Sequence, residues 1–121
     1  MVRIGTAFQL KGDGNHLWIV LSEPNSEGKV VTVNLTDSRH YPESTCHLVV
    51  GDHPFIQKPS VIRYKSPRLW KASDIERYLG FGTFIQHSDV SAALMDKIVQ
   101  GAFASEDLPP VFLAYIKPAR R

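Results

Sequence analysis

Two polar side chains suited to proton transfer and phosphate binding stand at the ends of the two most apolar segments of the chain. His16 precedes the apolar run Leu17–Leu21, and Thr36 follows the β-branched run Val30–Leu35. If these runs pair as an antiparallel hairpin, the start of the first lies beside the end of the second. The hairpin therefore predicts that the imidazole and the hydroxyl share one end of a sheet.

An imidazole beside a hydroxyl has two chemical uses. It can activate Thr36 as a nucleophile, or it can serve as general acid or base while Thr36 binds a phosphate oxygen. The second use suits RNA cleavage, because the 2′-hydroxyl of RNA is the nucleophile and the reaction needs a base, an acid and a charge stabiliser but no metal. The alternative is that His16 is a turn residue bonded to the backbone of Asp13 or Asn15.

A further histidine and a serine are weaker candidates for the same chemistry. His53 lies in the turn Gly51–Ile56, where it is either a second acid/base group or part of a turn capped by Asp52. Ser38 follows Thr36 closely and can help it bind a phosphate. We therefore take His16, Thr36 and His53 as candidate catalytic residues and Ser38 as a candidate substrate-binding residue.

Basic residues gather in one stretch although the formal net charge of the chain is only +2. Such a balance does not by itself indicate a nucleic-acid binder. The cluster is either a phosphate-binding groove or a solvated face of strands and loops. We take Lys58 and Arg63 as candidate contacts for an RNA backbone. The members of the cluster are Lys58, Arg63, Lys65, Arg68 and Lys71.

The sequence offers little support for catalysis by a cysteine or by a bound metal. The single cysteine, Cys46, cannot form an internal disulfide, and in a strand over residues 46–50 it reads as a small core residue with His47 on the opposite face. The five histidines show none of the close spacings typical of zinc sites. We expect no metal and no cofactor, and a metal-dependent hydrolase ranks third among the functions considered.

The elements that position these residues are mostly strands at first and helices later. The polar loop over residues 36–43 is long for a hairpin, and long loops in compact domains are often functional. Apolar alternation and β-branched runs predict strands over residues 6–10, 17–21, 30–35, 46–50 and 60–64.

Helix signals follow residue 72. Ser73–Glu76 has the form of a capping box, and Ser88 is the predicted N-cap of a second helix for which Gly101 is the stop. Residues 81–85 between them form a linker or a brief strand. The predicted helices span residues 73 to about 80, 88 to about 100, and a last one from Pro109–Pro110 to Pro118.

Strands followed by helices predict a mainly β protein with added α structure. We expect a small β-barrel or curled sheet with helices packed on one side. The length of 121 residues predicts one domain, with a β-barrel region over residues 1–72 and a helical C-terminal part over residues 73–118. Strand–helix alternation and a glycine-rich phosphate loop are both missing from the sequence, which argues against a parallel nucleotide-binding fold.

Residues 3–65 resemble the PemK/MazF-like toxins. The similarity lies in the strand Leu17–Ser22, in the strand Val30–Thr36, and in the opening segment Arg3–Ala7. The resemblance implies an SH3-like barrel of antiparallel strands with C-terminal helices packed against it. It also implies a metal-independent endoribonuclease that is neutralised by an antitoxin protein and is often a homodimer.

The chain departs from the family pattern at the first hairpin strand. Thr36 matches the family's Thr or Ser at the end of the second strand, whereas His16 stands where the family has an arginine. Histidine transfers protons near neutral pH more readily than arginine but cannot clamp a phosphate with a bidentate fork. The short segment Lys11–Asn15 and the run Gly51–Ile56 also differ, which indicates a divergent member.

We therefore expect a toxin-type endoribonuclease that cuts single-stranded RNA, with RNA, an antitoxin and a second copy of the chain as partners. The alternative is a non-catalytic SH3-like barrel that binds a protein or a nucleic acid. The first residues, Met1–Gly5, carry no apolar signal core, and no apolar run reaches the length of about 18 residues needed to cross a bilayer. The expected location is the cytoplasm, without membrane association.

Overall fold

The apolar run that begins at Leu17 becomes a strand buried on both faces. In the computed structural model, which describes residues 1–12 and 16–116, this strand is β2 (Leu17–Val20). Its odd positions, Leu17 and Ile19, belong to one hydrophobic cluster, and its even positions, Trp18 and Val20, belong to another. A strand with cores on both faces needs apolar residues at every position, which explains the lack of alternation.

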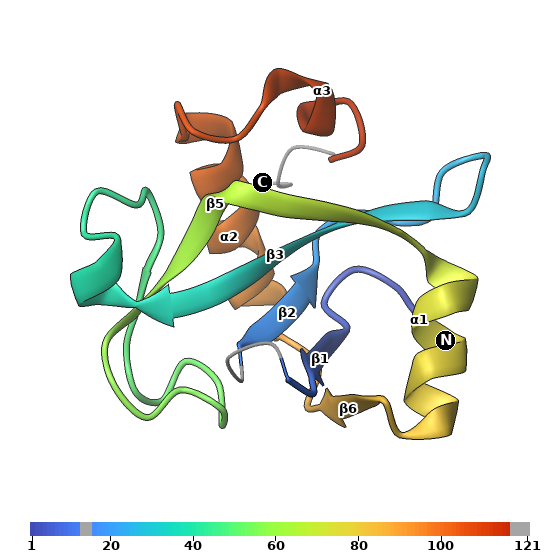
Figure 1. Cartoon of the computed structure of the whole chain (residues 1–121). Helices are drawn as coiled ribbons and strands as arrows, with labels where there is room; N and C mark the ends of the chain where they lie inside the picture. Colours follow the sequence, from blue (N-terminus) through green and yellow to red (C-terminus); the bar gives the residue numbers. More distant parts are fainter. Residues whose placement is uncertain (13–15, 117–121) are drawn as a thin grey trace.

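A curled antiparallel sheet is built around β2 (Figure 1). Within the described residues it has six strands in the order β4-β5-β3-β2-β1-β6, every neighbouring pair being antiparallel. The curl gives the sheet the form of half a barrel, with β4 and β6 at its edges. The other strands are β1 (Ala7–Leu10), β3 (Lys29–Asp37), β4 (His47–Leu48), β5 (Ser60–Lys71) and β6 (Phe84–His87).

The predicted hairpin of residues 17–21 and 30–35 is confirmed. β2 and β3 are antiparallel neighbours, and their register pairs Trp18 with Asn34 and Val20 with Thr32. One step further along the same register, position 16 lies opposite Thr36. The hairpin therefore brings the two ends together as the sequence indicates.

The strands after the hairpin differ in length from the prediction. The segment expected over residues 46–50 pairs only at His47–Leu48, because Asp52 accepts a hydrogen bond from the backbone N of Val49 at 2.9 Å and starts a turn there. Conversely, β5 continues past residue 64 to Lys71, since the long strand β3 offers it partners along its whole length. An irregularity between Thr32 and Asn34 accommodates the extra residues of β5.

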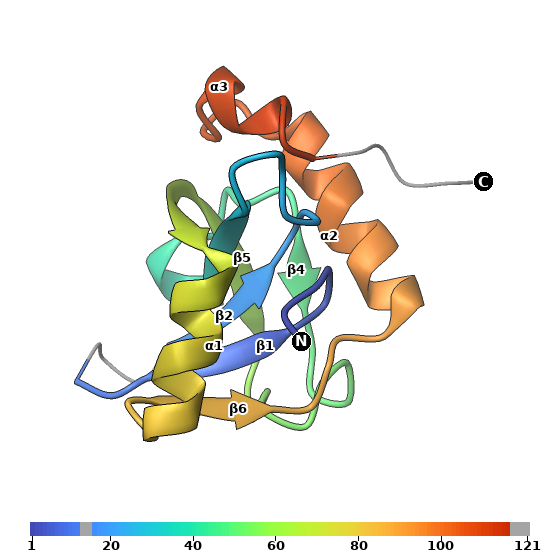
Figure 2. The same cartoon turned by 90° about the vertical axis from the view of Figure 1, so that its right-hand side faces the viewer.

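Two helices cover opposite sides of the sheet (Figure 2). α1 (Ala72–Phe81) packs on the cluster that contains Trp18 and Phe8, whereas α2 (Ala92–Ala104) packs on the cluster that contains Leu17 and Tyr64. The helices were expected on one side only. Because β2 is apolar on both faces, each face needs a cover.

The first two helices begin away from their predicted caps. α1 starts directly after β5 with Lys71 as N-cap, and Glu76 accepts a hydrogen bond from the backbone N of Val2 at 3.1 Å instead of completing a capping box with Ser73. α2 is capped by Ser91, whose hydroxyl accepts from Leu94 N at 3.2 Å, rather than by Ser88. The serine N-cap expected for the second helix therefore exists three residues later than predicted, whereas the capping box expected for the first helix is wrong, since α1 has no side-chain N-cap.

The last part of the chain agrees with the sequence in one element and departs from it in another. The brief strand allowed for residues 81–85 exists but begins later: β6 covers Phe84–His87, pairs with β1, and stacks Phe84 on Phe8 at a ring distance of 5.1 Å. The last helix, α3 (Pro110–Leu113), is shorter than expected, and its predicted end at Pro118 lies outside the described residues. None of the helices in the described segments is both long enough and apolar enough to cross a membrane.

Gly101 does not end α2 but lies inside it, where it makes room for a tyrosine. A Cβ at position 101 would overlap the hydroxyl oxygen of Tyr64 and lie 3.0 Å from the Cβ of Cys46. The Tyr64 hydroxyl donates a hydrogen bond to the Ile98 carbonyl at 2.7 Å, which fixes its position. The close approach of sheet and helix therefore requires glycine here.

We predict opposite effects for two glycine substitutions in helices. Gly101→Ala should lower the free energy of unfolding by about 1–3 kcal/mol, because the added methyl group overpacks the core. Gly80→Ala in α1 meets nothing within 4 Å and should raise it by about 0.5 kcal/mol through helix propensity. Urea unfolding of both variants measures the two effects, and equal changes would contradict the packing account.

Candidate functional site

A hollow of about 450 Å³ opens at the shared end of β2 and β3, and His16, Thr36, His40 and Lys58 are among the residues that line it. A second hollow of about 330 Å³ adjoins the first: His16, Thr36 and His40 line both, and Arg63 lines only the second. The three shared residues thus form the centre of a depression at the rim of the sheet, whose first hollow also has an apolar wall that includes Leu35, Phe55 and Ile56.

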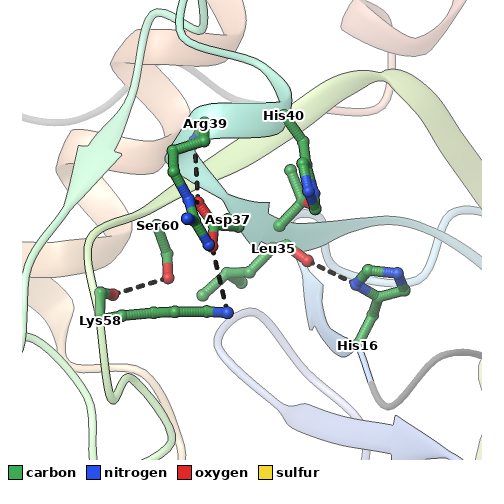
Figure 3. A network of polar contacts seen from close by, with 8 residues as sticks. His16, Leu35, Asp37, Arg39, His40, Lys58 and Ser60 are labelled. Carbon is green, nitrogen blue, oxygen red and sulfur yellow. Dashed lines mark hydrogen bonds and ion pairs between the residues drawn. The ribbon is translucent and has the colours of Figure 1, made fainter.

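The imidazole of His16 is held in one tautomer. Its Nδ1 donates a hydrogen bond to the carbonyl oxygen of Leu35 at 2.9 Å (Figure 3). Because a carbonyl only accepts, Nδ1 carries the proton and Nε2 is left as the basic nitrogen of the neutral ring. The ring is half-buried. The alternative partners, Asp13 and Asn15, lie outside the described residues.

His40 joins this site, although no motif in the sequence indicated a role for it. It ends the short 3₁₀ helix η1 (Ser38–His40), which turns the chain back over the end of β3. Its Nδ1 lies 3.5 Å from the hydroxyl oxygen of Thr36. In Figure 3 the rings of His16 and His40 lie to one side of Asp37. The signal that could have drawn attention to His40 is its place in the long polar loop over residues 36–43.

Asp37 organises the turn that carries His40. Its buried carboxylate, with only 7% of the side chain exposed, accepts hydrogen bonds from Arg39 N at 2.8 Å and Arg39 Nη2 at 2.7 Å, and it pairs with Lys58 Nζ at 3.1 Å. The Arg39 side chain, the Arg39 backbone N and the Lys58 ammonium together hold the pKa of Asp37 far below its usual range. Asp37 therefore stays ionised and caps η1.

Tyr41 anchors the other end of η1. Its ring is buried, and its hydroxyl donates a hydrogen bond to the carboxylate of Asp107. Burial, followed by this contact, raises the pKa of the phenol. The ammonium of Lys65 lies over the ring at 4.5 Å from its centre. His40 thus sits between two anchored residues, which fixes the backbone that presents it.

The cations expected at the site line its two hollows. Lys58 borders the first hollow but is already paired with Asp37. Arg63 and Lys65 border the second, and neither is in an ion pair with any carboxylate of the described residues. The positive charge that remains available to an anion therefore comes from β5.

His53 and Ser38 lie elsewhere. His53 is 5% exposed and lines neither hollow; its Nε2 donates to the carbonyl of Ser88 at 2.6 Å, and its Nδ1 accepts from the backbone N of Phe55 at 3.1 Å. Nε2 thus ties the turn over residues 51–56 to the segment before α2, and Nδ1 holds the turn itself together. Ser38 also lines neither hollow, and its backbone N bonds to the Pro59 carbonyl at 3.2 Å.

Cys46 is a core residue, as expected. It is 1% exposed, and burial raises the pKa of its thiol, which disfavours the nucleophilic thiolate. Across residues 1–12 and 16–116, no three His, Cys, Asp or Glu side chains are grouped so that they could hold a metal ion.

Comparison with protein-family models, with curated proteins and with solved structures finds no match to this chain. The function must therefore be argued from the chemistry of the site. That chemistry combines two imidazoles, one of known tautomer, with a hydroxyl and with cations that no described carboxylate neutralises. Such a set can move protons and bind a phosphate in one place.

We predict that Asp37 stabilises the fold in a pH-dependent manner. Its pKa is lower in the folded than in the unfolded chain, so its contribution is complete at neutral pH and is lost as the pH falls below about 4. The difference in free energy of unfolding between the wild type and Asp37→Asn, measured with urea from neutral to acidic pH, should therefore shrink in acid.

Glu27→Gln is the control, because the carboxylate of Glu27 is exposed and shares a surface ion pair with Lys29. That variant should unfold like the wild type across the range. A difference for Asp37→Asn that stays constant with pH would show that its charge contributes nothing.

Proposed function

We propose that the protein is a metal-independent endoribonuclease of the PemK/MazF-like toxin type that cleaves single-stranded RNA. The observation that carries the proposal is the meeting of His16, Thr36 and His40 around one depression bordered by cations. The resemblance of residues 3–65 to that family and the curled antiparallel sheet agree with it. The SH3-like barrel is part of the same proposal.

The reaction needs a base and an acid on opposite sides of a phosphate. Nε2 of His16 removes the proton of the 2′-hydroxyl, whose oxygen then attacks the adjacent phosphorus. The bond from phosphorus to the 5′-oxygen breaks, and protonated His40 supplies the proton that this leaving oxygen takes up. The products are a 2′,3′-cyclic phosphate and a 5′-hydroxyl, so atoms and charges balance without a metal.

Thr36 and the cations stabilise the charge on the phosphate during this reaction. The Thr36 hydroxyl, which lies 3.5 Å from Nδ1 of His40 and lines both hollows together with His16, donates to a non-bridging oxygen. Arg63 lines the same hollow as His16. It supplies from β5 the guanidinium that the resembling family carries at the position of His16.

His40 takes the place of His53 as the second acid/base group. Both nitrogens of His53 are occupied by backbone partners, so a proton transfer would break its hydrogen bonds. Nδ1 of His40, by contrast, has the Thr36 hydroxyl at 3.5 Å as its one hydrogen-bond partner among residues 1–12 and 16–116, and the side chain is exposed.

A toxin-type nuclease also has partners and a location. In this proposal the protein acts in the cytoplasm, is inhibited by an antitoxin protein, and functions as a homodimer. Without cleavage activity, the same depression would belong to a non-catalytic module that binds a protein or a nucleic acid.

We predict that purified protein cleaves single-stranded RNA in the presence of EDTA. His16→Ala and His40→Ala should each slow cleavage by about 10²- to 10⁴-fold, because each removes one proton-transfer group. Thr36→Val should cost about 10²-fold and Thr36→Ser much less, because serine keeps the hydroxyl. Gel analysis of labelled RNA gives the rates and the product ends.

His47→Ala is the control for the histidine variants, since His47 is exposed and hydrogen-bonds the Pro42 carbonyl outside the two hollows. It should cleave at the wild-type rate. Equal activity of all the variants would remove these residues from the mechanism. A wild type without activity would contradict the nuclease proposal and would leave the non-catalytic binding module as the remaining function.

We further predict that induced expression of the wild type in a bacterial host arrests growth, whereas expression of His16→Ala at the same level does not. The physical reason is that RNA cleavage, rather than the presence of the fold, is the toxic event. Growth curves and immunoblots measure the two quantities. Arrest by both proteins would mean that the effect does not come from this site.

A further inference from the structure

β5 presents positive charge that no described carboxylate neutralises. The strand contains Arg63, Lys65, Arg68 and Lys71 and no acidic residue. Within the described part of the chain, none of these four is in an ion pair. The cations that are paired with a carboxylate there are Arg3, Lys29, Arg39, Lys58 and Arg77.

Three of the β5 cations, Arg63, Lys65 and Arg68, share one face of the sheet. Arg63 and Lys65 line the hollow that contains Thr36, so both lie on the side of the candidate site. Lys71 follows Trp70 directly in the strand and therefore points to the opposite face. Across the β3–β5 register, Arg63 lies opposite Asn34, Arg68 opposite Thr32, and Trp70 opposite Val30.

The cationic face continues toward α1 at Arg68. The guanidinium carbon of Arg68 lies 4.9 Å from the ring centre of Trp18 and 6.0 Å from that of Trp70. Trp18 is buried beneath, whereas Arg68 is exposed to solvent. A guanidinium supported by indoles offers a plane on which a nucleobase can stack.

Two buried polar atoms on the same face lack a partner. Oδ1 of Asn34, in a residue that is 3% exposed, and Nε1 of Trp70 have no hydrogen-bond partner among the described residues. Buried unsatisfied atoms are rare in folded proteins. The Asn34 oxygen is an acceptor and lies opposite Arg63 in the register, whereas the Trp70 nitrogen is a donor and follows Arg68 along β5. The two atoms therefore lie near the two ends of the row of cations.

We infer that this face of β5, which we call the β5 strip (Arg63, Lys65, Arg68 and Trp70), binds the single-stranded RNA that extends from the cleaved phosphate. Arg63 and Lys65 contact phosphates next to the site, and Arg68 stacks on a base further along. This inference rests on the proposed function, which places the cleaved phosphate at Thr36. Arg63 and Lys65 line the hollow of Thr36, and from there β5 continues toward α1 (Figure 1).

Nucleic acid fits the strip better than an acidic protein does. Unpaired cations alone attract any polyanion. The Arg68 guanidinium, which lies over two indole rings, also offers a face for stacking. Every nucleobase can stack on such a face, whereas a carboxylate side chain has no aromatic ring to stack. Unpaired bases are required, since bases inside a duplex have no free face.

The test uses a short mixed-sequence RNA in which 2′-O-methyl groups block the nucleophile, so that binding is measured without cleavage. Fluorescence anisotropy gives the dissociation constant over a range of salt concentrations. Arg68→Ala should weaken binding about tenfold. Lys65→Ala should also weaken it and should lower the slope of log K against log salt by about 0.7, as expected for one lost phosphate contact.

Two further variants separate charge from stacking. Arg68→Lys keeps the positive charge, so it should bind more weakly than the wild type with an unchanged salt slope. Lys71→Ala removes a cation from the opposite face of the same strand and should bind like the wild type. Binding should also change the tryptophan fluorescence, because the protein contains only two tryptophans, Trp18 and Trp70, and both contact Arg68.

Failure of this inference can be distinguished from failure of the proposed function. If the wild type cleaves unmodified RNA but Arg68→Ala and Lys65→Ala bind and cleave like it, the RNA runs elsewhere and the strip is overturned. If the modified RNA binds through the strip but unmodified RNA stays intact, the result supports RNA binding by the β5 strip and contradicts the proposed nuclease activity. Equal competition by polyglutamate and by the RNA, with no effect of Arg68→Lys, would overturn base stacking.

Discussion

The pairing of β2 with β3 is the constraint on which the rest of the structure depends. Alternate residues of β2 belong to hydrophobic clusters on opposite faces, one under α2 and the other under α1. A slip of the register by one residue would move every side chain to the wrong face. Because both faces are filled, the register is fixed, and it is this register that sets His16 beside the end of β3. The position of the site is therefore a by-product of core packing.

The local structure of the rim depends on one buried charge. Asp37 ends β3, caps η1 and draws Arg39 and Lys58 together. The turn that results places His40 near Thr36. Since the carboxylate neutralises Lys58, the charge available to a substrate shifts to β5, where no acidic residue lies. A structural ion-pair cluster on one side of the depression thus leaves an uncompensated cationic surface on the other.

Much of the sheet, and half of the site, could be predicted from the sequence. The apolar runs and the turn residues between them place the hairpin, and with it His16 and Thr36. The role of His40 was missed because it depends on a carboxylate binding its neighbour's side chain, which no spacing rule encodes. The burial of His53 away from the two hollows could not be predicted, because it follows from a tertiary contact with Ser88. Likewise, Ser73 and Gly101 carry local signals for helix ends that packing against β5 and Tyr64 overrides.

The most direct test of the central claim is a crystal structure with an uncleavable dinucleotide that carries a 2′-deoxy group before the phosphate. The account predicts that the phosphate lies within hydrogen-bonding distance of the Thr36 hydroxyl, with Nε2 of His16 facing the 2′ position and His40 facing the 5′-oxygen. A phosphate bound away from this depression, or an imidazole of His16 turned from the sugar, would contradict it.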